Sequence, residues 1–360
     1  MEVQLSETAQ GALEHGCPVL VLGGPGSGKT TLSLLKAQAM LPALYPGQEI
    51  LFLSFSRAAV RQVEIRCCDI LRSEERRQIA VRTYHAFAMD ILRAHGRLLT
   101  GRVPRIIYPG EEKLAKAVFD GDWDAEAERL ARDEGRYVFS QFAAAAAHLV
   151  AGSASIASLL ANRYPVIILD EFQDTDDAQW ALVKALSARS KTMFMADPDQ
   201  RIFDYNARVD PERINHLRAH LGPAEFDLSG ENHRSPDVGI LQYADAVLTN
   251  RPLPDTKDVI TRSYGPKAFD STVHAGVACM LGSLRKAGIA HPSVVVLART
   301  NALVGKLSTI LGQEHSFKGQ IIRPVEHDVL WDADLTAAAA LVVASVLEWQ
   351  SSVLDRKSVV

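Results

Sequence analysis

The stretch VLVLGGPGSGKTTL (residues 19–32) decides the fold of this chain. An apolar run is followed by a glycine-rich turn and then by a helical pattern, which fits the phosphate-binding loop G-x-x-x-x-G-K-[ST]. Glycines let such a loop fold its backbone N–H groups around phosphate at the positive end of the following helix. The sequence therefore predicts a nucleotide-binding loop between a buried strand and a helix.

The residues of this loop have separate expected roles. Lys29 is expected to reach the β- and γ-phosphates of the nucleotide, and the Thr30 hydroxyl is expected to ligate Mg²⁺. The residues expected to surround the nucleotide are Gly23, Gly24, Pro25, Gly26, Ser27, Gly28, Lys29, Thr30 and Thr31.

A second stretch, VIILDEFQDTD (166–176), reads as a buried strand that ends in two adjacent carboxylates. Carboxylates are costly to bury unless they are paired or hold a metal ion. A P-loop NTPase needs a strand that ends in an aspartate for Mg²⁺, and Asp170 fits this role. Glu171 would then orient and deprotonate the attacking water. An ordinary solvated turn remains the alternative for Asp174, Asp176 and Asp177.

Short apolar runs alternate with helical patterns along the first part of the chain. This alternation predicts an α/β fold, with a parallel sheet and helices on both faces. The runs expected to form buried strands are 18–24, 49–56, 165–171 and 191–198. The expected helices are 29–40, 57–71 and 176–188.

The remaining segments suggest two further parts. Residues 96–160 hold few strand-like runs and much alanine, which predicts a mostly helical insertion. The run SVVVLARTN (293–301) reads as a strand of another α/β unit. At 360 residues the chain is long enough for about two to three domains.

The composition of the chain indicates a broad class of protein but no particular function. With 47% hydrophobic and 23% charged residues, the chain resembles a soluble globular protein. A net charge of −4 does not indicate a nucleic-acid partner, although a local basic groove would be sufficient for one. Four cysteines without metal-ligand spacing favour a reduced, cytoplasmic protein. The polar N-terminus is unlike a signal peptide, and the apolar run 335–349 is too short to span a bilayer. No membrane association is therefore expected.

Several motifs, in order, resemble those of the superfamily 1 DNA helicases of the UvrD/Rep type. The resemblance extends over roughly residues 5–235, with a weaker echo at 294–303. The motifs are SFSRAAVRQV (54–63), RTYHAF (82–87), DEFQDT (170–175), MADPDQRIFDY (195–205) and LSGENHRS (228–235). It implies a RecA-like P-loop NTPase domain formed by 1–95 and 161–235, interrupted by the insertion at 96–160 and followed by a partial second motor domain at 236–360.

The resemblance also implies further nucleotide contacts. Gln200 resembles the family's γ-phosphate sensor, and Arg234 resembles the arginine that neutralises charge in the transition state. Gln10 corresponds to a glutamine that reads adenine, although its spacing from Leu5 is one residue longer than usual. His233 stands where the family often has a tyrosine that stacks on adenine. The implied cofactors are ATP and Mg²⁺.

The implied partner is single-stranded DNA. Tyr205 takes the place of an aromatic residue that stacks on a base, and base stacking tolerates any sequence. Phe55, Arg57, Thr83 and His85 are implied contacts along the same groove. The alternative is that the aromatic residues belong to the core or surface and that Arg57 is simply solvated.

The sequence departs from the family in its later part. Asn206 follows Tyr205 where the family has an arginine, and the family's later motifs, including a second arginine finger, are absent from 236–360. The expected function is that of an ATP-dependent DNA helicase or translocase motor domain, which hydrolyses ATP and contacts single-stranded DNA. Three alternatives stay open: a truncated piece of a longer helicase, a nucleotide-binding module completed by a protein partner, and a P-loop kinase or other small-molecule NTPase. The pathway, such as DNA repair, is also open.

Overall fold

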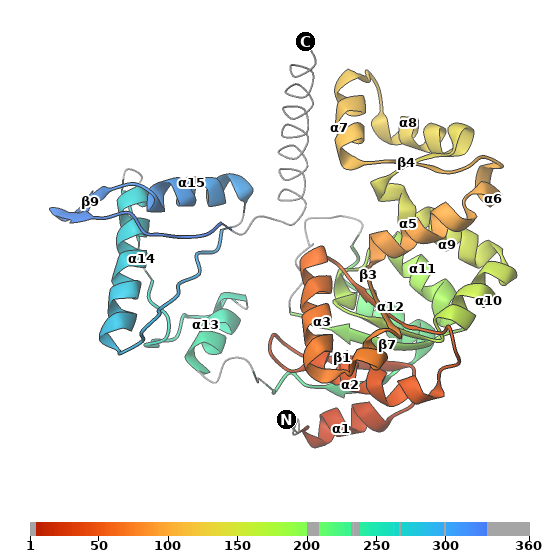
Figure 1. Cartoon of the computed structure of the whole chain (residues 1–360), viewed down its shortest axis with the longest axis horizontal. Helices are drawn as coiled ribbons and strands as arrows, with labels where there is room; N and C mark the ends of the chain where they lie inside the picture. Colours follow the sequence, from red (N-terminus) through yellow and green to blue (C-terminus); the bar gives the residue numbers. More distant parts are fainter. Residues whose placement is uncertain are drawn as a thin grey trace, which may run out of the picture. The chain divides into compact units, whose positions relative to one another are not determined.

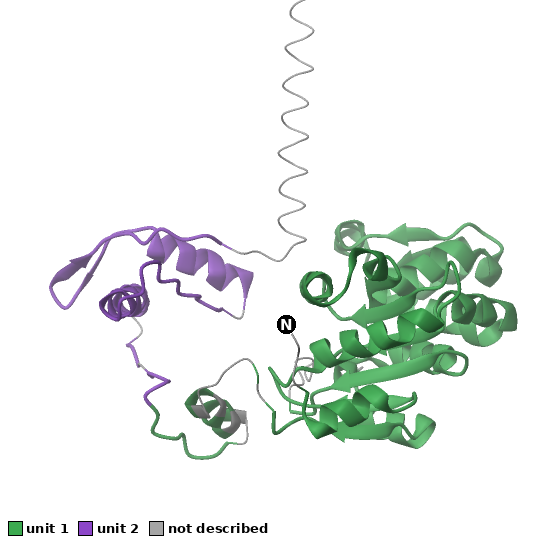
Figure 2. Ribbon diagram, turned by 60° about the horizontal axis from the view of Figure 1, so that its bottom comes forward, with its two compact units in different colours: residues 1–256 green, residues 257–360 purple. Residues whose placement is uncertain are grey.

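The computed structural model describes residues 5–329, apart from 200–208, 232, 234–237, 249, 262, 266, 267 and 299. The chain divides between Thr256 and Lys257 into two units, each with a compact described part (Figure 2). The run 335–349 lies outside the described residues.

A six-stranded parallel sheet forms the centre of the first unit (Figure 1). Its strand order is β3-β2-β6-β7-β1-β8. The four predicted strands are confirmed. The strands are β1 (Val19–Leu22), β2 (Ile50–Ser54), β3 (Ile79–Thr83), β6 (Val166–Leu169), β7 (Lys191–Ala196) and β8 (Ala224–Asp227). The sequence did not predict β3 and β8. Both are edge strands, where polar residues such as Arg82 and Glu225 interrupt the apolar pattern.

Helices cover both faces of this sheet, which confirms the predicted fold class. Alternate residues of each central strand enter different cores: in β6, Val166 and Ile168 enter one, and Ile167 and Leu169 the other. One face carries α1 (Glu7–Glu14), α2 (Lys29–Met40) and α3 (Arg57–Ile70). The other carries α5 (Tyr84–His95), α9 (Phe142–Gly152), α10 (Ala154–Arg163), α11 (Asp177–Ser187) and α12 (Arg213–Leu221).

Between β3 and β6 the chain forms an additional small subdomain. Its core consists of Ile107, Ala127, Leu130 and Val138, with Trp123 packed against them. A parallel pair of strands, β4 (Arg105–Ile107) and β5 (Arg136–Val138), accompanies its helices and was not predicted. The helices are α6 (Arg97–Thr100), α7 (Pro109–Val118), α8 (Trp123–Arg129) and a short π-helix (Leu130–Glu134). The remaining elements described in the first unit are α4 (Ser73–Arg76), α13 (Val238–Leu248) and three short 3₁₀ helices, Leu41–Ala43, Phe139–Gln141 and Phe172–Asp174.

The second unit contains α14 (Phe269–Lys286), α15 (Asn301–Leu311) and a hairpin of β9 (His315–Phe317) with β10 (Gln320–Ile322). The strand expected at 293–301 is wrong for the residues described there, because 293–298 form no strand. A buried parallel strand needs paired neighbours, and Val295 and Leu297 are 78% and 88% exposed. Among the described residues of this unit, β9 and β10 pair only with each other.

Within the described ranges no single helix is long and apolar enough to cross a membrane. The two helical segments Phe139–Gly152 and Ala154–Arg163, which meet at a bend of 105°, are long and apolar enough only when taken together. Its buried side chains, Phe142, Leu149 and Leu160 among them, belong to the core beneath the sheet.

Candidate nucleotide site

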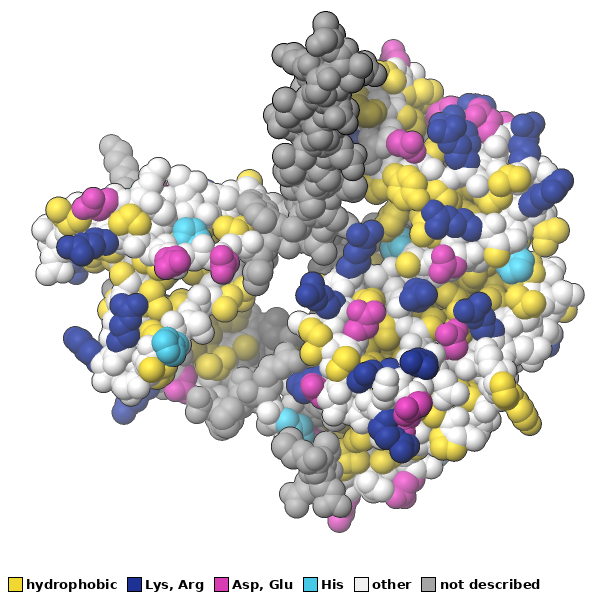
Figure 3. All heavy atoms as spheres, viewed as in Figure 1, with side chains coloured by type: hydrophobic (Ala, Val, Ile, Leu, Met, Phe, Trp, Pro, Cys, Tyr) yellow, Lys and Arg dark blue, Asp and Glu magenta, His cyan; other side chains and the backbone are white. Residues whose placement is uncertain are grey.

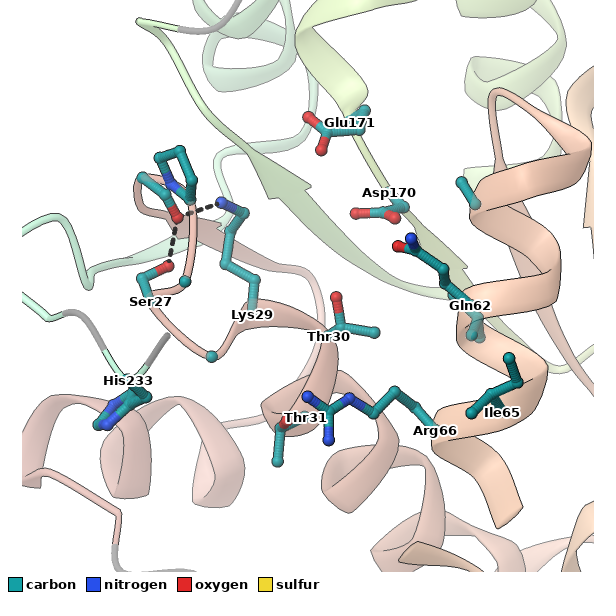
Figure 4. A pocket seen from close by; sticks show the side chains of 16 residues that line it. Ser27, Lys29, Thr30, Thr31, Gln62, Ile65, Arg66, Asp170, Glu171 and His233 are labelled. Atoms are coloured by element: carbon teal, nitrogen blue, oxygen red, sulfur yellow. Dashed lines mark hydrogen bonds between the residues drawn. The ribbon is translucent and has the colours of Figure 1, made fainter. Parts of the chain in front are cut away.

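A cavity of about 550 Å³ lies at the carboxyl end of β1 (Figure 4). The phosphate-binding loop, the helix α3, the end of β6 and His233 all border it. Its lining residues are Gly24, Pro25, Gly26, Ser27, Gly28, Lys29, Thr30, Thr31, Ala59, Gln62, Val63, Ile65, Arg66, Asp170, Glu171 and His233. The structure therefore places the two motifs that the sequence singled out around one space.

Glycine is required at particular positions of the loop. Gly26 and Gly28 have φ angles of 81° and 88°, a left-handed conformation that other residues rarely adopt. A Cβ atom on Gly23 would lie 2.6 Å from the Ser27 hydroxyl oxygen. That hydroxyl donates a 2.9 Å hydrogen bond to the Gly24 carbonyl, which closes the loop ahead of α2.

Lys29 and Thr30 begin α2 inside the cavity. The buried Lys29 ammonium donates hydrogen bonds to the carbonyls of Gly23 and, at 3.0 Å, of Gly24. The Thr30 hydroxyl points into the space between Lys29 and Asp170 (Figure 4). A fixed ammonium and a hydroxyl beside the backbone N–H groups at the start of a helix suit an anionic phosphate chain.

Asp170 and Glu171 occupy the end of β6 on the other side of the cavity. The backbone N–H of Asp170 donates to the Leu53 carbonyl at 2.9 Å, so the sheet hydrogen bonding continues up to this residue. Burial, reinforced by the neighbouring Glu171 charge, raises the pKa of Asp170 to about 7, although the Lys29 ammonium opposes the rise. A carboxylate that is buried although burial disfavours its charged form is typical of a functional site.

Glu171 has an unusual backbone conformation for a residue with a side chain. Its φ and ψ angles are 49° and 44°, which lie in the left-handed region. Such a conformation costs about 1–3 kcal/mol, and it persists only where the surrounding structure enforces it. The turn at Glu171 separates its side chain from that of Asp170, and Figure 4 shows the two carboxylates at different heights along the cavity.

Gln173 holds the Glu171 carboxylate in place, a role that the sequence did not predict. Its side-chain amide donates to Glu171 Oε2 at 2.7 Å, and its carbonyl oxygen accepts from the backbone N–H of Asp197 at 3.0 Å. This buried side chain thus connects the end of β6 with the end of β7. The sequence could have indicated this role only through the position of Gln173, two residues after Glu171.

The three aspartates that follow, Asp174, Asp176 and Asp177, lie away from the cavity. Asp176 caps α11, where its carboxylate accepts from the N–H of Gln179 at 2.7 Å. The Asp177 carboxylate pairs with the buried Arg213 of α12. Asp174 is itself buried. None of these three aspartates lines the cavity, so the two carboxylates facing it here come from Asp170 and Glu171.

The helix α3 contributes two polar side chains that the sequence did not single out. Gln62 points towards Asp170, and Arg66 extends towards Thr31 (Figure 4). They lie four residues apart and hence on one face of the helix. This spacing is the feature of the sequence that could have indicated them. Arg66 is exposed and adds a cation to the cavity beside the start of α2.

His233 is the one described residue of its motif that borders the cavity. Its backbone N–H donates to the Gly26 carbonyl at 2.8 Å, so this segment touches the phosphate-binding loop. Its ring faces Gly28, and its Nε2 lies 3.2 Å from the Glu231 carboxylate. The predicted site residues Gln200, Tyr205 and Arg234 lie outside the described residues.

Gln10 is placed apart from the phosphate-binding loop. It is an exposed residue of α1 whose amide donates to the Glu14 side chain. It does not line the main cavity. It borders a separate hollow of about 460 Å³, which is lined by Leu5, Ser6, Glu7, Gln10, Gly11 and Glu14.

The residues expected on the DNA path follow the two neighbouring strands, β2 and β3. Phe55 comes directly after β2, and Thr83 ends β3 and caps α5 by accepting from the N–H of Ala86 at 3.1 Å. Arg57 is an exposed residue at the start of α3. All strands of this sheet are parallel, so these residues share one edge with Asp170 and the phosphate-binding loop.

His85 stacks face to face on Phe139, an aromatic residue that the sequence did not single out. The ring centroids are 4.0 Å apart at an interplanar angle of 10°. Burial lowers the pKa of His85, so its ring is neutral at neutral pH. On the face of the first unit in Figure 3, Lys and Arg are interspersed with Asp and Glu and form no separate basic patch. The stacked His85 and Phe139 rings therefore indicate a DNA contact more specifically than the charges on this face do.

The oxygen donors in this cavity suit Mg²⁺. Magnesium prefers oxygen ligands and keeps several waters, with one or two protein ligands and the phosphates of the substrate. Thr30 and Asp170 supply a hydroxyl and a carboxylate on opposite sides of the space. Among the described residues, no group of three or more His, Cys, Asp or Glu could hold a metal ion by itself.

Replacing Asp170 by asparagine is expected to stabilise the protein when neither metal nor nucleotide is bound. Because the folded-state pKa is raised from 3.8 to about 7, stability is lost as the pH rises through this window. A shift of this size corresponds to at most roughly 4 kcal/mol. In urea unfolding with a chelator present, the gain should be larger at about pH 8 than at about pH 5. Equal gains at both pH values would contradict the assigned cause.

The region that forms this site is similar in sequence to known proteins. Residues 5–128 and 122–219 match the family model of the UvrD/REP helicase N-terminal domain. The ATP-dependent DNA helicase PcrA of Leuconostoc citreum is 23% identical over 281 residues, which are 65% of this chain and 37% of that protein. The ATP-dependent DNA helicase Rep of Escherichia coli (strain K12) is 23% identical over 281 residues, 65% of this chain and 42% of that protein.

A third relative matches over a shorter region. The RecBCD enzyme subunit RecB of Mycolicibacterium smegmatis is 34% identical over 109 residues, which are 29% of this chain and 10% of that protein. The chain thus spans less than half the length of each of these three relatives.

Proposed function

The chain belongs to the UvrD/REP helicase family, and from this premise we propose that it is the ATP-binding motor part of a DNA helicase or translocase. In this proposal it binds ATP with Mg²⁺, hydrolyses it, and contacts single-stranded DNA. We also propose that the complete motor unwinds duplex DNA. A further domain, of the same polypeptide or of a partner protein, would complete that motor. A cytoplasmic location belongs to the same proposal.

One observation supports the ATPase function most directly. The lysine of the phosphate-binding loop and the carboxylates at the end of β6 face the same cavity, although they are about 140 residues apart in the chain. In the sheet, β7 separates β1 from β6, which leaves roughly 10 Å between the two motifs at ordinary strand spacing. This spacing accommodates a phosphate chain with a hydrated cation.

Each residue then has a defined task in hydrolysis. Lys29 and the loop N–H groups bind the phosphates, while Thr30 and Asp170 would hold Mg²⁺. The bound cation would neutralise charge on the phosphates. Glu171, oriented by Gln173, takes a proton from the attacking water. Arg66 adds positive charge on the side of the cavity that faces Thr31.

The strand order suggests how DNA would lie relative to this site. From one edge, the sheet presents the Thr83 and Phe55 positions, then the Asp170–Glu171 carboxylates, then the phosphate-binding loop beyond β7. The candidate DNA contacts and the ATP site therefore occupy adjoining parts of one sheet edge. This arrangement supports a motor in which the two ligands influence each other.

The DNA part of the proposal predicts that Phe139→Ala weakens binding of a single-stranded oligothymidylate. Stacking of a base on an aromatic side chain contributes about 1–3 kcal/mol, which corresponds to a loss of roughly tenfold or more. Fluorescence anisotropy of a labelled oligonucleotide measures the change. Phe119→Ala is the matched control, because Phe119 and Phe139 are 38% and 41% exposed and both lie in the 96–160 region. Equal effects of the two variants would count against this DNA path.

The ATP part is tested by titrating the chain with a fluorescent, non-hydrolysable ATP analogue, with and without Mg²⁺. Saturable binding that Mg²⁺ strengthens is the expected result. Absence of binding at millimolar analogue would refute the proposed nucleotide site. A P-loop kinase would bind the analogue equally well, but its hydrolysis of ATP would not respond to DNA.

A further inference from the structure

Tyr84 is a buried phenol that the proposed chemistry does not use. Its side chain is 1% exposed, and its ring packs against Phe55 at a centroid distance of 4.9 Å. Its hydroxyl has no hydrogen-bond partner among the described residues. A buried polar group without a partner costs about 1–3 kcal/mol, so each such group in a native structure calls for an explanation.

The strand register places Tyr84 two strands away from the Asp170–Glu171 carboxylates, at the same edge of the sheet. Ser54 of β2 pairs with Thr83 of β3, and Leu53 pairs with Leu169 of β6. Tyr84 is the first residue after β3, Phe55 is the first after β2, and Asp170 is the first after β6. Three adjacent strand ends thus bring the phenol and the carboxylates to the same part of the sheet edge.

The electrostatic environment of Tyr84 agrees with this placement. Burial, together with the charges of Asp170 and Glu171, raises the pKa of the Tyr84 hydroxyl well above its ordinary value. The phenol therefore keeps its proton at neutral pH and remains a hydrogen-bond donor. Glu171 can accept such a bond, because its Oε2 bonds to Gln173 and a carboxylate has capacity for further donors.

The backbone around Tyr84 leads in the other direction, to the candidate DNA contacts. Tyr84 is the first residue of α5, between the helix cap Thr83 and the stacked His85. A base that contacts the His85–Phe139 stack would act on the first turn of α5. Because Tyr84 belongs to that turn, a shift of the turn moves its hydroxyl relative to the carboxylates.

We propose that Tyr84 is a positioning residue that couples single-stranded DNA to the nucleotide site, by donating a hydrogen bond from its hydroxyl to the Glu171 carboxylate when both ligands are bound. This inference rests on the proposed function. It extends that function by assigning the contact between the two ligand sites to one hydroxyl group. DNA would then favour the geometry in which Glu171 is held from two sides, by Gln173 and by Tyr84.

The test compares the whole chain with its Tyr84→Phe variant, which lacks only the hydroxyl. The affinity for a fluorescent, non-hydrolysable ATP analogue with Mg²⁺ is measured without and with saturating oligothymidylate, and the ratio gives the coupling between the ligands. In the wild type we expect DNA to raise the affinity roughly fivefold or more. In Tyr84→Phe the ratio should fall towards one, while the affinity for each ligand alone stays within about twofold.

A control and a stability measurement separate this role from a purely structural one. Tyr164→Phe is the matched control, because Tyr164 also packs against a phenylalanine ring, that of Phe87 at 5.8 Å, but lies at the opposite end of β6. Loss of an unpartnered buried hydroxyl should leave the unfolding midpoint of Tyr84→Phe unchanged or raised. A lost coupling in a variant that is no less stable therefore supports positioning.

The outcomes also separate this inference from the proposed function. If the wild-type chain binds neither the analogue nor the oligonucleotide, the proposed function fails, and the inference fails with it. If the wild type binds both and Tyr84→Phe keeps the full coupling, or if the wild type shows no coupling at all, only the role of Tyr84 is overturned.

Discussion

Replacing Lys29 by alanine is expected to remove nucleotide binding. In the structure its ammonium is buried in the cavity and held by the carbonyls of Gly23 and Gly24, at the position where phosphates would enter. Loss of charge-assisted hydrogen bonds to the phosphates should weaken the affinity for ATP by roughly 100-fold or more. Isothermal titration with ATP and Mg²⁺ measures this effect.

Two further variants make this prediction specific. Lys29→Arg keeps the charge but cannot fit the same carbonyl pair, so it should also lose most of the affinity. Lys113→Ala removes an exposed lysine of α7 and should bind ATP like the wild type. Full ATP affinity in Lys29→Ala, in a protein with an unchanged unfolding midpoint, would show that this loop does not bind phosphate.

Replacing Glu171 by glutamine is expected to leave ATP binding intact and to abolish turnover. The substitution keeps the size of the side chain and an oxygen that can accept from Gln173, but it removes the base. A general base contributes about 10²–10⁴-fold, so kcat should fall by that factor while the ATP affinity changes by less than about threefold. Phosphate release in steady state, together with analogue binding, separates the two effects.

Glu231→Gln provides the comparison for this variant. Glu231 lies next to His233 but does not line the cavity, so its substitution should leave kcat near the wild-type value. Retained hydrolysis by Glu171→Gln would remove Glu171 as the base. The proton acceptor would then have to be sought elsewhere.

The central sheet and the nucleotide loop could be predicted from the sequence because their signals are local. A strand buried on both faces reads as an unbroken apolar run, and the G-x-x-x-x-G-K-T spacing requires a specific turn. Accordingly, the four central strands were confirmed, as was the placement of Asp170 at the end of one of them. The edge strands β3 and β8 were missed, because only part of their surface is covered and their sequences are mixed.

The residues missed at the site depend on tertiary neighbours. Gln62 and Arg66 read as an ordinary solvated helix face until α3 is placed against the phosphate-binding loop. Phe139 lies more than 50 residues from His85, so no local pattern could predict their stacking. The segment 293–298 shows the opposite error, since β-branched residues favour a strand but cannot form one without a paired neighbour.

The strain at the catalytic end of the sheet has a common physical origin. Asp170 is held with a raised pKa, Glu171 has a left-handed backbone, and Tyr84 keeps an unpartnered hydroxyl, all within one group of strand ends. Each of these features lowers the stability of the free protein. Bound cation, nucleotide and DNA would relieve them, which explains why sequence rules based on stability alone do not predict them.

The most direct test of the account is the rate of ATP hydrolysis by this chain, measured with and without a single-stranded DNA oligonucleotide. We predict Mg²⁺-dependent hydrolysis that Lys29→Ala removes and that DNA stimulates, since the proposed DNA path and the carboxylates share one edge of the sheet. Hydrolysis that is indifferent to DNA, or nucleotide binding that survives in Lys29→Ala, would contradict it.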